Sequence, residues 1–501
     1  MPSIRTLARR AAPREYPRQP VGQPIPFPAP ALGMNTRDSV SALDPREARI
    51  IENMIPESGK LVIRKGKTAF QTISGASAVG SMWTHDGVSA NVLLAAANGK
   101  IYDVTGAPSQ LATGYSLNTW STQQFNNTTL GVNGTDTPFS FNGTAIGASG
   151  LSGVGLTITN LRTVHVVGVR YWFTEKAKAH VWYLAVNAIT GVLTKFDLDQ
   201  ETLGGYCVGI YGFGPYTVFI MSTGEVVTYQ GDPGADFSLA KRYNAPRPVG
   251  YDPGVDVNGE PVIMTESGPL PFELIARGIE DSSVDAGPWG KIAPSSADDF
   301  ESFGSIPGWN GLFFKGLVIF NIPTSSTTSK QWVFNTRTKG WSFFTNLQAS
   351  KFAELNGTLY FGDLAQGKVF SNTGGLDDSS NLVAIVRGAF AYPFGNKANG
   401  QYTLGQLNCK ASGTVTAQLQ VDVDFKEAGI TAPEVPISSA GSGPWDGPWD
   451  GPWGEDGEAL LRWSKIKGYG RAVAPVVKFN SAADDLEFFA TNVMAAPAGA
   501  L

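Results

Sequence analysis

One pattern recurs along most of this chain and limits what it can fold into. A short apolar run is followed by a glycine-containing turn and then by an apolar or aromatic run. Such pairs of runs are typical of β-hairpins, and an Asn-Gly pair such as Asn98-Gly99 is a strong hairpin signal. The pattern recurs in seven segments, which are residues 92–104, 130–143, 182–198, 218–231, 262–274, 317–341 and 355–371.

The distance between these units predicts the architecture. They return at intervals of about 35–55 residues, which suits propeller blades of about four strands. We therefore expect a mostly β chain built on an irregular β-propeller of six or seven blades over residues 60–380. The 59 Gly and 32 Pro are scattered as turn residues, which favours many short strands over helices. WD40 and kelch consensus sequences are absent, and stacked β-sandwiches are the alternative architecture.

Residues 381–501 predict a separate all-β domain of sandwich-like form. Within residues 414–425, apolar residues from Val415 to Phe425 alternate with polar residues from Thr416 to Asp424. This alternation predicts a half-buried strand. Further strands are expected at Val473–Phe479 and Leu486–Met494.

Two segments precede the propeller. Residues 35–59 are predicted to hold a capped helix and a lead-in, with Asp44 as N-cap, Pro45 at the first helical position, Glu47 three residues after the cap, and an end near Met54. Residues 1–34 form a Pro/Arg-rich segment that is expected to be an extended arm. The arm is either a disordered tail or a segment that docks on a neighbouring subunit or touches DNA. Its candidate partner-binding residues are Arg5, Arg9, Arg10, Arg14 and Arg18.

A Gly-Pro-Trp triplet repeats three times in residues 443–454 and places Trp445, Trp449 and Trp453 at a period of four. Gly-Pro pairs favour turns, so the segment is expected to be a loop. The indoles either pack on the sandwich or form an aromatic surface for a sugar or a partner protein.

No motif points to catalysis, a metal or a cofactor. The three histidines, His85, His165 and His180, lack metal-ligand spacing, and no G-x-S-x-G elbow or sialidase Asp-box occurs. We expect Asp422 and Asp424 to be solvated, although they share a strand face on which they could hold a cation. Asp298-Asp299 is expected in a loop.

Charge and cysteine content add little that is specific. The formal net charge of −5 suits simple solubility, and it also suits a channel wall along which DNA slides. The two cysteines are expected to be buried thiols rather than a disulfide. The chain shows neither an apolar run of membrane-spanning length nor a secretory signal at Met1–Ala12, which predicts folding in a cytoplasm.

Two segments resemble a known family. Residues 32–70 resemble the opening of tail proteins of short-tailed, podovirus-type bacteriophages, and residues 422–501 resemble their C-terminal end. The matching residues in the first segment are Asn35, Thr36, Arg37, Asp38, Pro45, Ala48, Asn53, Pro56, Gly59, Arg64 and Gly66. Met34 departs from the glycine or leucine expected after Gly33.

The resemblance implies a tail hub or nozzle protein, which is a structural virion component without enzymatic activity or cofactor. Such a protein forms a ring, expected to be a homohexamer, below the portal and adaptor and beside tail fibres or spikes. Double-stranded DNA is retained in the ring and passes through its lumen during ejection, without sequence-specific binding. The location implied is the virion tail, assembled in the cytoplasm of the bacterial host, with no integral membrane segment. The alternatives are a carbohydrate-binding or carbohydrate-cleaving propeller that uses the Trp loop, and a cellular scaffold propeller that binds peptides on its top face.

Overall fold

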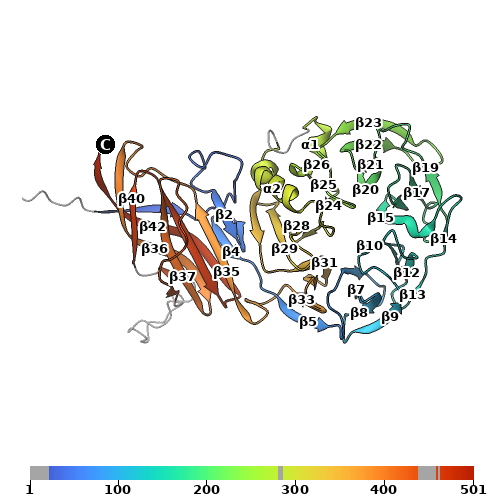
Figure 1. Cartoon of the computed structure of the whole chain (residues 1–501), viewed down its shortest axis with the longest axis horizontal. Helices are drawn as coiled ribbons and strands as arrows, with labels where there is room; N and C mark the ends of the chain where they lie inside the picture. The colour runs from blue at the N-terminus through green and yellow to red at the C-terminus, as the bar shows by residue number, and fades with distance from the viewer. Residues whose placement is uncertain (1–21, 280–285, 438–458, 461–462, 501) are drawn as a thin grey trace, which may run out of the picture.

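Seven small antiparallel blades arranged around one axis form the larger part of the protein, as the computed structural model shows (Figure 1). The structure describes residues 22–279, 286–437, 459–460 and 463–500. Of this fold 53% is strand and 5% is helix, so the prediction of a mostly β chain built on a β-propeller is confirmed. Each of the seven repeated sequence segments falls in a different blade.

The first four blades are four-stranded meanders in chain order, each beginning with its innermost strand. Blade 1 holds β6 (Ser81–His85), β7 (Val92–Ala97), β8 (Lys100–Asp103) and β9 (Ser109–Thr113). Blade 2 holds β10 (Ser121–Phe125), β11 (Thr128–Val132), β12 (Phe139–Phe141) and β13 (Ile146–Ala148). Blade 3 holds β15 (Leu161–Val167), β16 (Arg170–Glu175), β17 (Val181–Tyr183) and β19 (Thr194–Phe196), and beside it β14 (Leu151–Ser152) pairs with β18 (Gly191–Val192). Blade 4 holds β20 (Cys207–Phe213), β21 (Tyr216–Met221), β22 (Glu225–Gln230) and β23 (Ser238–Asn244).

Blades 5 and 7 depart from this plan, whereas blade 6 is again a four-stranded meander in chain order. Blade 5 has three strands, β24 (Gly254–Val257), β25 (Glu260–Thr265) and β26 (Gly268–Pro271). Blade 6 holds β27 (Asn310–Phe314), β28 (Leu317–Pro323), β29 (Ser329–Asn335) and β30 (Gly340–Phe344). Blade 7 holds β31 (Ala349–Leu355), β32 (Thr358–Asp363) and β33 (Lys368–Ser371), and its outer strand is β5 (Thr68–Thr72) from the start of the propeller. The pairing of β5 with β33 closes the ring.

Local sequence accounts for the hairpins within the blades. In blade 1, Asn98 and Gly99 have φ angles of 53° and 66° and form the turn between β7 and β8. Consecutive positive φ angles suit the twist of a two-residue hairpin, and Asn and Gly adopt them most readily. The Asn-Gly pair alone predicts this turn.

Short helices lie between blades 5 and 6. They are α1 (Phe272–Ala276), η2 (Trp289–Ile292) and α2 (Ala293–Phe303), while η1 (Ile158–Asn160) precedes blade 3. The expectation that Asp298-Asp299 lies in a loop is wrong, because both residues belong to α2. Asp299 is buried, accepts a hydrogen bond of 2.7 Å from the Trp332 indole, and pairs with Lys330. No helix in the described ranges has the length and apolar character of a membrane span.

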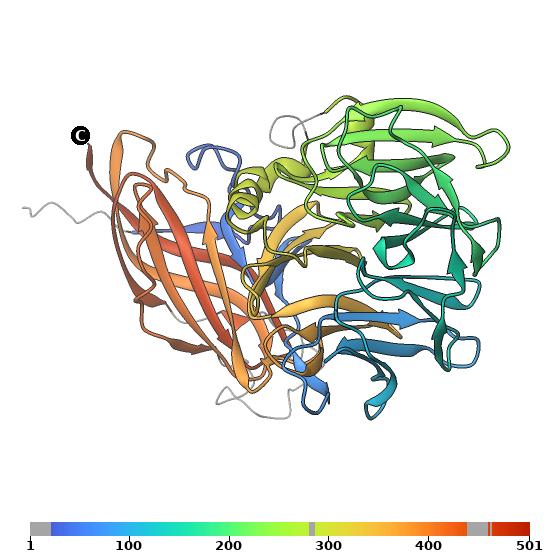
Figure 2. The ribbon, with the colours of Figure 1, turned by 45° about the vertical axis from the view of Figure 1, so that its right-hand side comes forward.

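Both ends of the described chain build a β-sandwich beside the ring (Figures 1 and 2). One sheet contains β1 (Gln23–Pro28), β3 (Met54–Glu57), β4 (Lys60–Ile63), β36 (Ala398–Ser412), β39 (Ala459–Leu460), β40 (Ser464–Gly470) and β42 (Asp485–Ala500). The other contains β2 (Ala48–Glu52), β34 (Leu376–Asp377), β35 (Ser380–Gly388), β37 (Val415–Val423), β38 (Val435–Ile437) and β41 (Val473–Ser481). The strands expected in residues 414–425, 473–479 and 486–494 are present.

The propeller and the sandwich share one sheet and one core. Strand β2 pairs in parallel with β30 of blade 6 at Glu52 and Phe343, which joins blade 6 and half of the sandwich into a ten-stranded sheet. One cluster of buried apolar side chains runs from the sandwich into blades 5 and 6, where it includes Phe320, Phe334 and Trp341. Burial of this shared surface holds the two parts together.

The predicted helix from Asp44 to Met54 is wrong. The hydrogen bond of 3.3 Å from the Asp44 N–H to the Glu47 carboxylate forms as in a capping box, but the chain turns only once and continues as β2 and β3. Asn53 separates these strands with a φ of 57°, outside the helical region. Pairing of β2 with β35, more than 300 residues away in sequence, buries its apolar side chains and overrides the local helix signal.

The N-terminal arm is only partly described. Residues 1–21, which contain the five candidate arginines, lie outside the described residues. From Gln23 to Pro28 the segment is extended, and it pairs with β42 at the edge of the sandwich. The propeller itself runs from β5 to β33, within the predicted range of 60–380, while β3 and β4 belong to the sandwich.

The entry and exit of the propeller are tied together by Asn53, Arg64 and Asp377. The Arg64 guanidinium donates to both oxygens of the Asp377 carboxylate, at 2.9 and 2.7 Å, and to the Asn53 side-chain oxygen at 2.8 Å. Asn53 in turn donates to the Val383 carbonyl at 2.8 Å. All three residues are buried. We call this group the joint.

Candidate functional site: the channel mouth of the propeller

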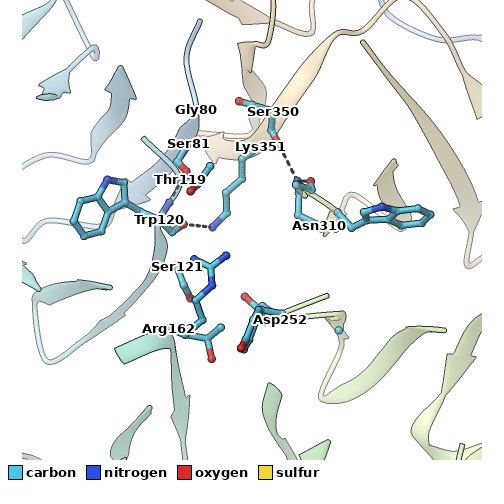
Figure 3. A pocket seen from close by; sticks show the side chains of 16 residues that line it. Gly80, Ser81, Thr119, Trp120, Ser121, Arg162, Asp252, Asn310, Ser350 and Lys351 are labelled. Carbon is cyan, nitrogen blue, oxygen red and sulfur yellow. Dashed lines mark hydrogen bonds between the residues drawn. The ribbon is translucent and has the colours of Figure 1, made fainter. Parts of the chain in front are cut away.

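A cavity of about 130 Å³ opens at one end of the propeller axis, where the innermost strands begin (Figure 3). The residues that line it come from blades 1, 2, 3, 5, 6 and 7. We use the term channel mouth for this cavity and for six of its polar side chains, which are Ser81, Ser121, Arg162, Asp252, Asn310 and Lys351.

Backbone bulges place both cations of the channel mouth. In blade 3 the pairing of β15 with β16 shifts between Leu161 and Thr163, so Arg162 is an extra residue. In blade 7 the pairing of β31 with β32 shifts between Ala349 and Phe352, so Ser350 and Lys351 face one residue on the partner strand. A bulge interrupts the ladder and redirects a side chain. The two bulges account for charged side chains at the channel within otherwise apolar strands.

Arg162 reaches into the cavity from the start of β15. One guanidinium nitrogen, Nη1, donates a hydrogen bond of 2.7 Å to the carbonyl of Asn133. The guanidinium carbon lies 5.1 Å from the centre of the Tyr251 ring, in the range of a cation–π contact. Burial lowers the pKa of Arg162, and Tyr251 and Asp252 partly oppose this. The group remains positively charged at neutral pH, since its ordinary pKa is above 12.

Lys351 reaches the same space from β31, and Figure 3 shows its side chain approaching that of Arg162. Its Nζ donates to the carbonyl of Trp120 at 3.2 Å. Burial lowers the pKa of Lys351, and the negative charge of Asp252 acts in the opposite direction. Neither Lys351 nor Arg162 forms an ion pair with any carboxylate in the part of the chain that the structure describes.

Asp252 is the acidic residue of the channel mouth. It precedes β24, with a φ of 56°, and its N–H donates to the carbonyl of Val208 at 2.8 Å. Its carboxylate accepts a hydrogen bond of 2.8 Å from the Tyr211 hydroxyl and lies 3.9 Å from Nδ1 of His165. Burial lowers the pKa of His165, which keeps the imidazole neutral at neutral pH. The channel mouth thus contains two positive groups and one negative group.

This arrangement is suited to binding a polar ligand. His165 shares a hydrogen bond of 2.9 Å with the hydroxyl of Thr163, which also lines the cavity. Hydrogen-bond donors from several blades converge on one small polar space, as is typical of sites that orient a ligand.

The residues predicted as partner-binding are not among these. Trp445, Trp449 and Trp453 lie outside the described residues, as do Arg5, Arg9, Arg10, Arg14 and Arg18. Arg162 and Lys351 are absent from the sequence-based predictions. The available signal was a single basic residue near the start of an apolar strand, in residues 161–167 and 349–355. The bulges that aim these side chains are not visible in the sequence.

Asp422 differs from expectation as well. The sequence predicts a solvated residue, with a cation ligand as the alternative, yet Asp422 is 1% exposed. Its carboxylate pairs with Arg49 at 2.9 Å and with Arg387 at 2.7 Å. Two guanidinium groups therefore occupy the place that a cation would take, and Asp422 serves the sandwich core.

A second cluster of metal-ligand types lies on blade 3. One ligand atom from each of His180, Asp197 and Asp199 falls within 4.8 Å of the others. Asp197 already pairs with Lys195 at 2.6 Å, and His180 with Glu175 at 2.8 Å. Most of the cluster is therefore satisfied without a cation, and we assign no metal site to it. Cys207 and Cys409 are buried free thiols, as predicted.

Comparisons with known proteins identify no relative by sequence. No protein-family model matches the chain, and no curated protein matches it. Solved structures with partial likeness include the WD40 β-propeller domain of Doa1, with 9% identity and a TM-score of 0.37 over 61% of this chain and 96% of that domain. BamB from Moraxella catarrhalis has 9% identity and a TM-score of 0.36 over 64% of this chain and 95% of its own. YCF48 bound to D1 peptide has 12% identity and a TM-score of 0.37 over 65% of this chain and 97% of its own. The seven-bladed architecture rests on the strand pairing of this chain itself.

Proposed function

We propose that this protein is a non-enzymatic structural component of a short-tailed phage particle, a tail hub or nozzle subunit that assembles into a ring around the DNA path. The ring is expected to be a homohexamer that contacts portal and adaptor proteins and tail fibres or spikes. It would retain packaged DNA and let it pass during ejection.

The observation that carries this proposal is the position of the residues that resemble the phage family. Asn53, Arg64 and Gly66 belong to the joint or border it, and Asn35 is buried beside Glu47, to which it donates a hydrogen bond of 3.0 Å. Ala48 is fully buried in β2. The resemblance therefore concerns residues that hold the sandwich against the propeller. A ring subunit needs this relationship to be rigid, because each copy must present the same surfaces to its neighbours.

The shape of the channel mouth bears on where DNA would pass. A space of about 130 Å³ crossed by Arg162 and Lys351 has room for a small solute or several water molecules, but not for a duplex. In the proposed ring the DNA path therefore lies between subunits. A net charge of −5 favours sliding over tight phosphate binding.

The proposal is tested on the purified full-length protein by negative-stain microscopy and mass photometry, and by immunogold labelling of phage tails. We expect closed rings of one stoichiometry and labelling at the tail. A protein that stays monomeric at all concentrations and never associates with particles would overturn the proposal.

The carbohydrate-binding or carbohydrate-cleaving alternative predicts a different result. A glycan array and a polysaccharide depolymerisation assay would be positive, and a triple variant with Trp445, Trp449 and Trp453 replaced by Ala would lose the signal. The tail-hub proposal predicts no glycan binding and no depolymerisation for the natural protein or for the triple variant.

A further inference from the structure

The two cations of the channel mouth, Arg162 and Lys351, are half-buried, and they differ from three more deeply buried arginines of this protein in their partners. Arg64 pairs with Asp377, Arg49 with Asp422, and Arg170 with Asp232, each at 2.9 Å or less. Arg162 and Lys351 have no such partner among the described residues. A charge withdrawn from water is costly unless it is paired. Among the described residues, the two half-buried cations therefore leave positive charge at the cavity that an anion from outside can neutralise.

The other charged groups near the cavity do not neutralise the positive charge of Arg162 and Lys351. Asp252 is the acidic residue that acts on both cations, and it forms an ion pair with neither. One oxygen of the Asp252 carboxylate accepts a hydrogen bond from the Tyr211 hydroxyl. His165 adds no positive charge, because burial lowers its pKa and keeps the imidazole neutral. Counting Arg162 and Lys351 against Asp252 leaves one positive charge in excess. Low-dielectric walls strengthen the attraction of such an excess for an anion.

Several hydrogen-bond donors at the cavity have no acceptor among the residues that the structure describes. A guanidinium carries five N–H donors and an ammonium three. Arg162 and Lys351 each use one of theirs in a hydrogen bond. The Ser81 and Ser121 hydroxyl oxygens accept bonds from the N–H groups of Trp120 and Val164, at 2.8 and 3.2 Å, and this leaves both O–H groups available as donors. Oxygen atoms with lone pairs are the acceptors that such a set of donors fits.

We propose that the channel mouth binds one small oxyanion, a solute bearing a carboxylate or phosphate group, between Arg162 and Lys351. The cavity volume of about 130 Å³ suits a group of this size. Because the anion would contact strands of blades 3 and 7, it would link blade 3 to the blade in which the ring closes. The proposal is independent of a role in a phage tail.

Isothermal titration calorimetry on the full-length protein tests the proposal, with inorganic phosphate, acetate and chloride as separate titrants at matched ionic strength. We expect saturable binding of one phosphate or one acetate per chain, and none for chloride. The titrant that binds more tightly identifies the phosphate-bearing or the carboxylate-bearing class of solute. Failure of both titrants to bind above the chloride background would overturn the proposal.

Three variants separate a built site from general charge. Lys351→Met should weaken binding at least about tenfold, because it removes a charged donor while keeping the length of the side chain. Lys241→Met, on the exposed outer strand of blade 4, should leave affinity unchanged and serves as the matched control. Asp252→Asn should strengthen binding about fivefold, because it removes the negative charge that opposes the anion.

The Asp252→Asn variant also controls for misfolding, because a misfolded protein would lose anion binding and this variant is expected to gain affinity. Asn tolerates the positive φ of this position, and its side-chain oxygen can still accept from the Tyr211 hydroxyl. Weaker binding in a folded Asp252→Asn variant, or equal loss in the Lys351 and Lys241 variants, would contradict the proposal. A ring that assembles without binding any anion would leave the proposed function standing and refute this inference alone.

Discussion

The guanidinium of Arg64 and the carboxylate of Asp377 face each other with two parallel hydrogen bonds of 2.9 and 2.7 Å, where the chain enters and leaves the propeller. Their side chains are 1% and 5% exposed. The pair thus fastens the two crossings between propeller and sandwich to each other, close to where β5 joins blade 7. Bidentate geometry of this kind fixes direction as well as distance.

Removing one member of this pair should strongly destabilise the protein. We expect Arg64→Met to lower the free energy of unfolding by about 3–5 kcal/mol, because Asp377 stays buried without its partner. Urea denaturation followed by circular dichroism measures this. In a double-mutant cycle with Asp377→Leu, the double variant should be less destabilised than the sum of the single variants by about 2 kcal/mol. Additive effects would mean that the two residues act separately.

Gly66 is expected to tolerate no side chain. A Cβ atom at this position would lie 2.0 Å from the carbonyl oxygen of Leu376, and the obstacle is backbone that cannot rotate away. Gly66→Ala should therefore lower the free energy of unfolding by about 3 kcal/mol through forced displacement of the chain. Gly106→Ala is the control, since no atom lies within 4 Å of the added Cβ and its φ is not positive. Comparable stability of the two variants would show that the backbone at Leu376 can shift to make room for the added Cβ atom.

The buried Asp422 should matter far more than its exposed neighbour in the same network. Asp422→Asn leaves Arg49 and Arg387 without their shared counter-charge, and we expect a loss of about 3 kcal/mol. Glu427 also pairs with Arg49, at 2.6 Å, but its side chain is 50% exposed. Glu427→Gln should therefore cost less than about 1 kcal/mol. Thermal melting of both variants measures the difference, and an equal effect would contradict the assigned role of burial.

Two buried histidines predict a dependence of stability on pH. Burial lowers the pKa of His85 and of His165 below the ordinary value of 6.5. Between the lowered values and 6.5 the unfolded chain binds more protons than the folded chain, so the free energy of unfolding rises with pH in this interval. Each histidine contributes at most about 1.4 kcal/mol per pH unit.

Urea denaturation from pH 5 to pH 7.5 measures this slope. A variant with His85 and His165 both replaced by Asn should show a flatter profile over the same range than the natural protein. A natural protein that becomes more stable as the pH falls through this interval would contradict the prediction.

The candidate site could be predicted only in part. Basic residues inside apolar strands, Arg162 and Lys351, were available as a signal in the sequence. Their convergence was not, because it depends on two separate bulges and on the closing of a ring that brings β15 and β31 around one axis. Asp422 illustrates the same limit, since strand alternation placed it on the polar face but did not reveal Arg49 and Arg387 opposite it.

By itself, the sequence determined one hairpin unit in each blade and limited the number of blades to six or seven. Turn residues such as Asn98-Gly99 and the alternation of β37 act through φ preferences and side-chain direction over a few residues, so they can be recognised locally. Only the tertiary structure decided that residues 48–57 are strands instead of a helix, that β5 closes blade 7, and that the two ends of the chain share a sandwich. These outcomes depend on burial against partners hundreds of residues away, and a local helix signal is weaker than that burial.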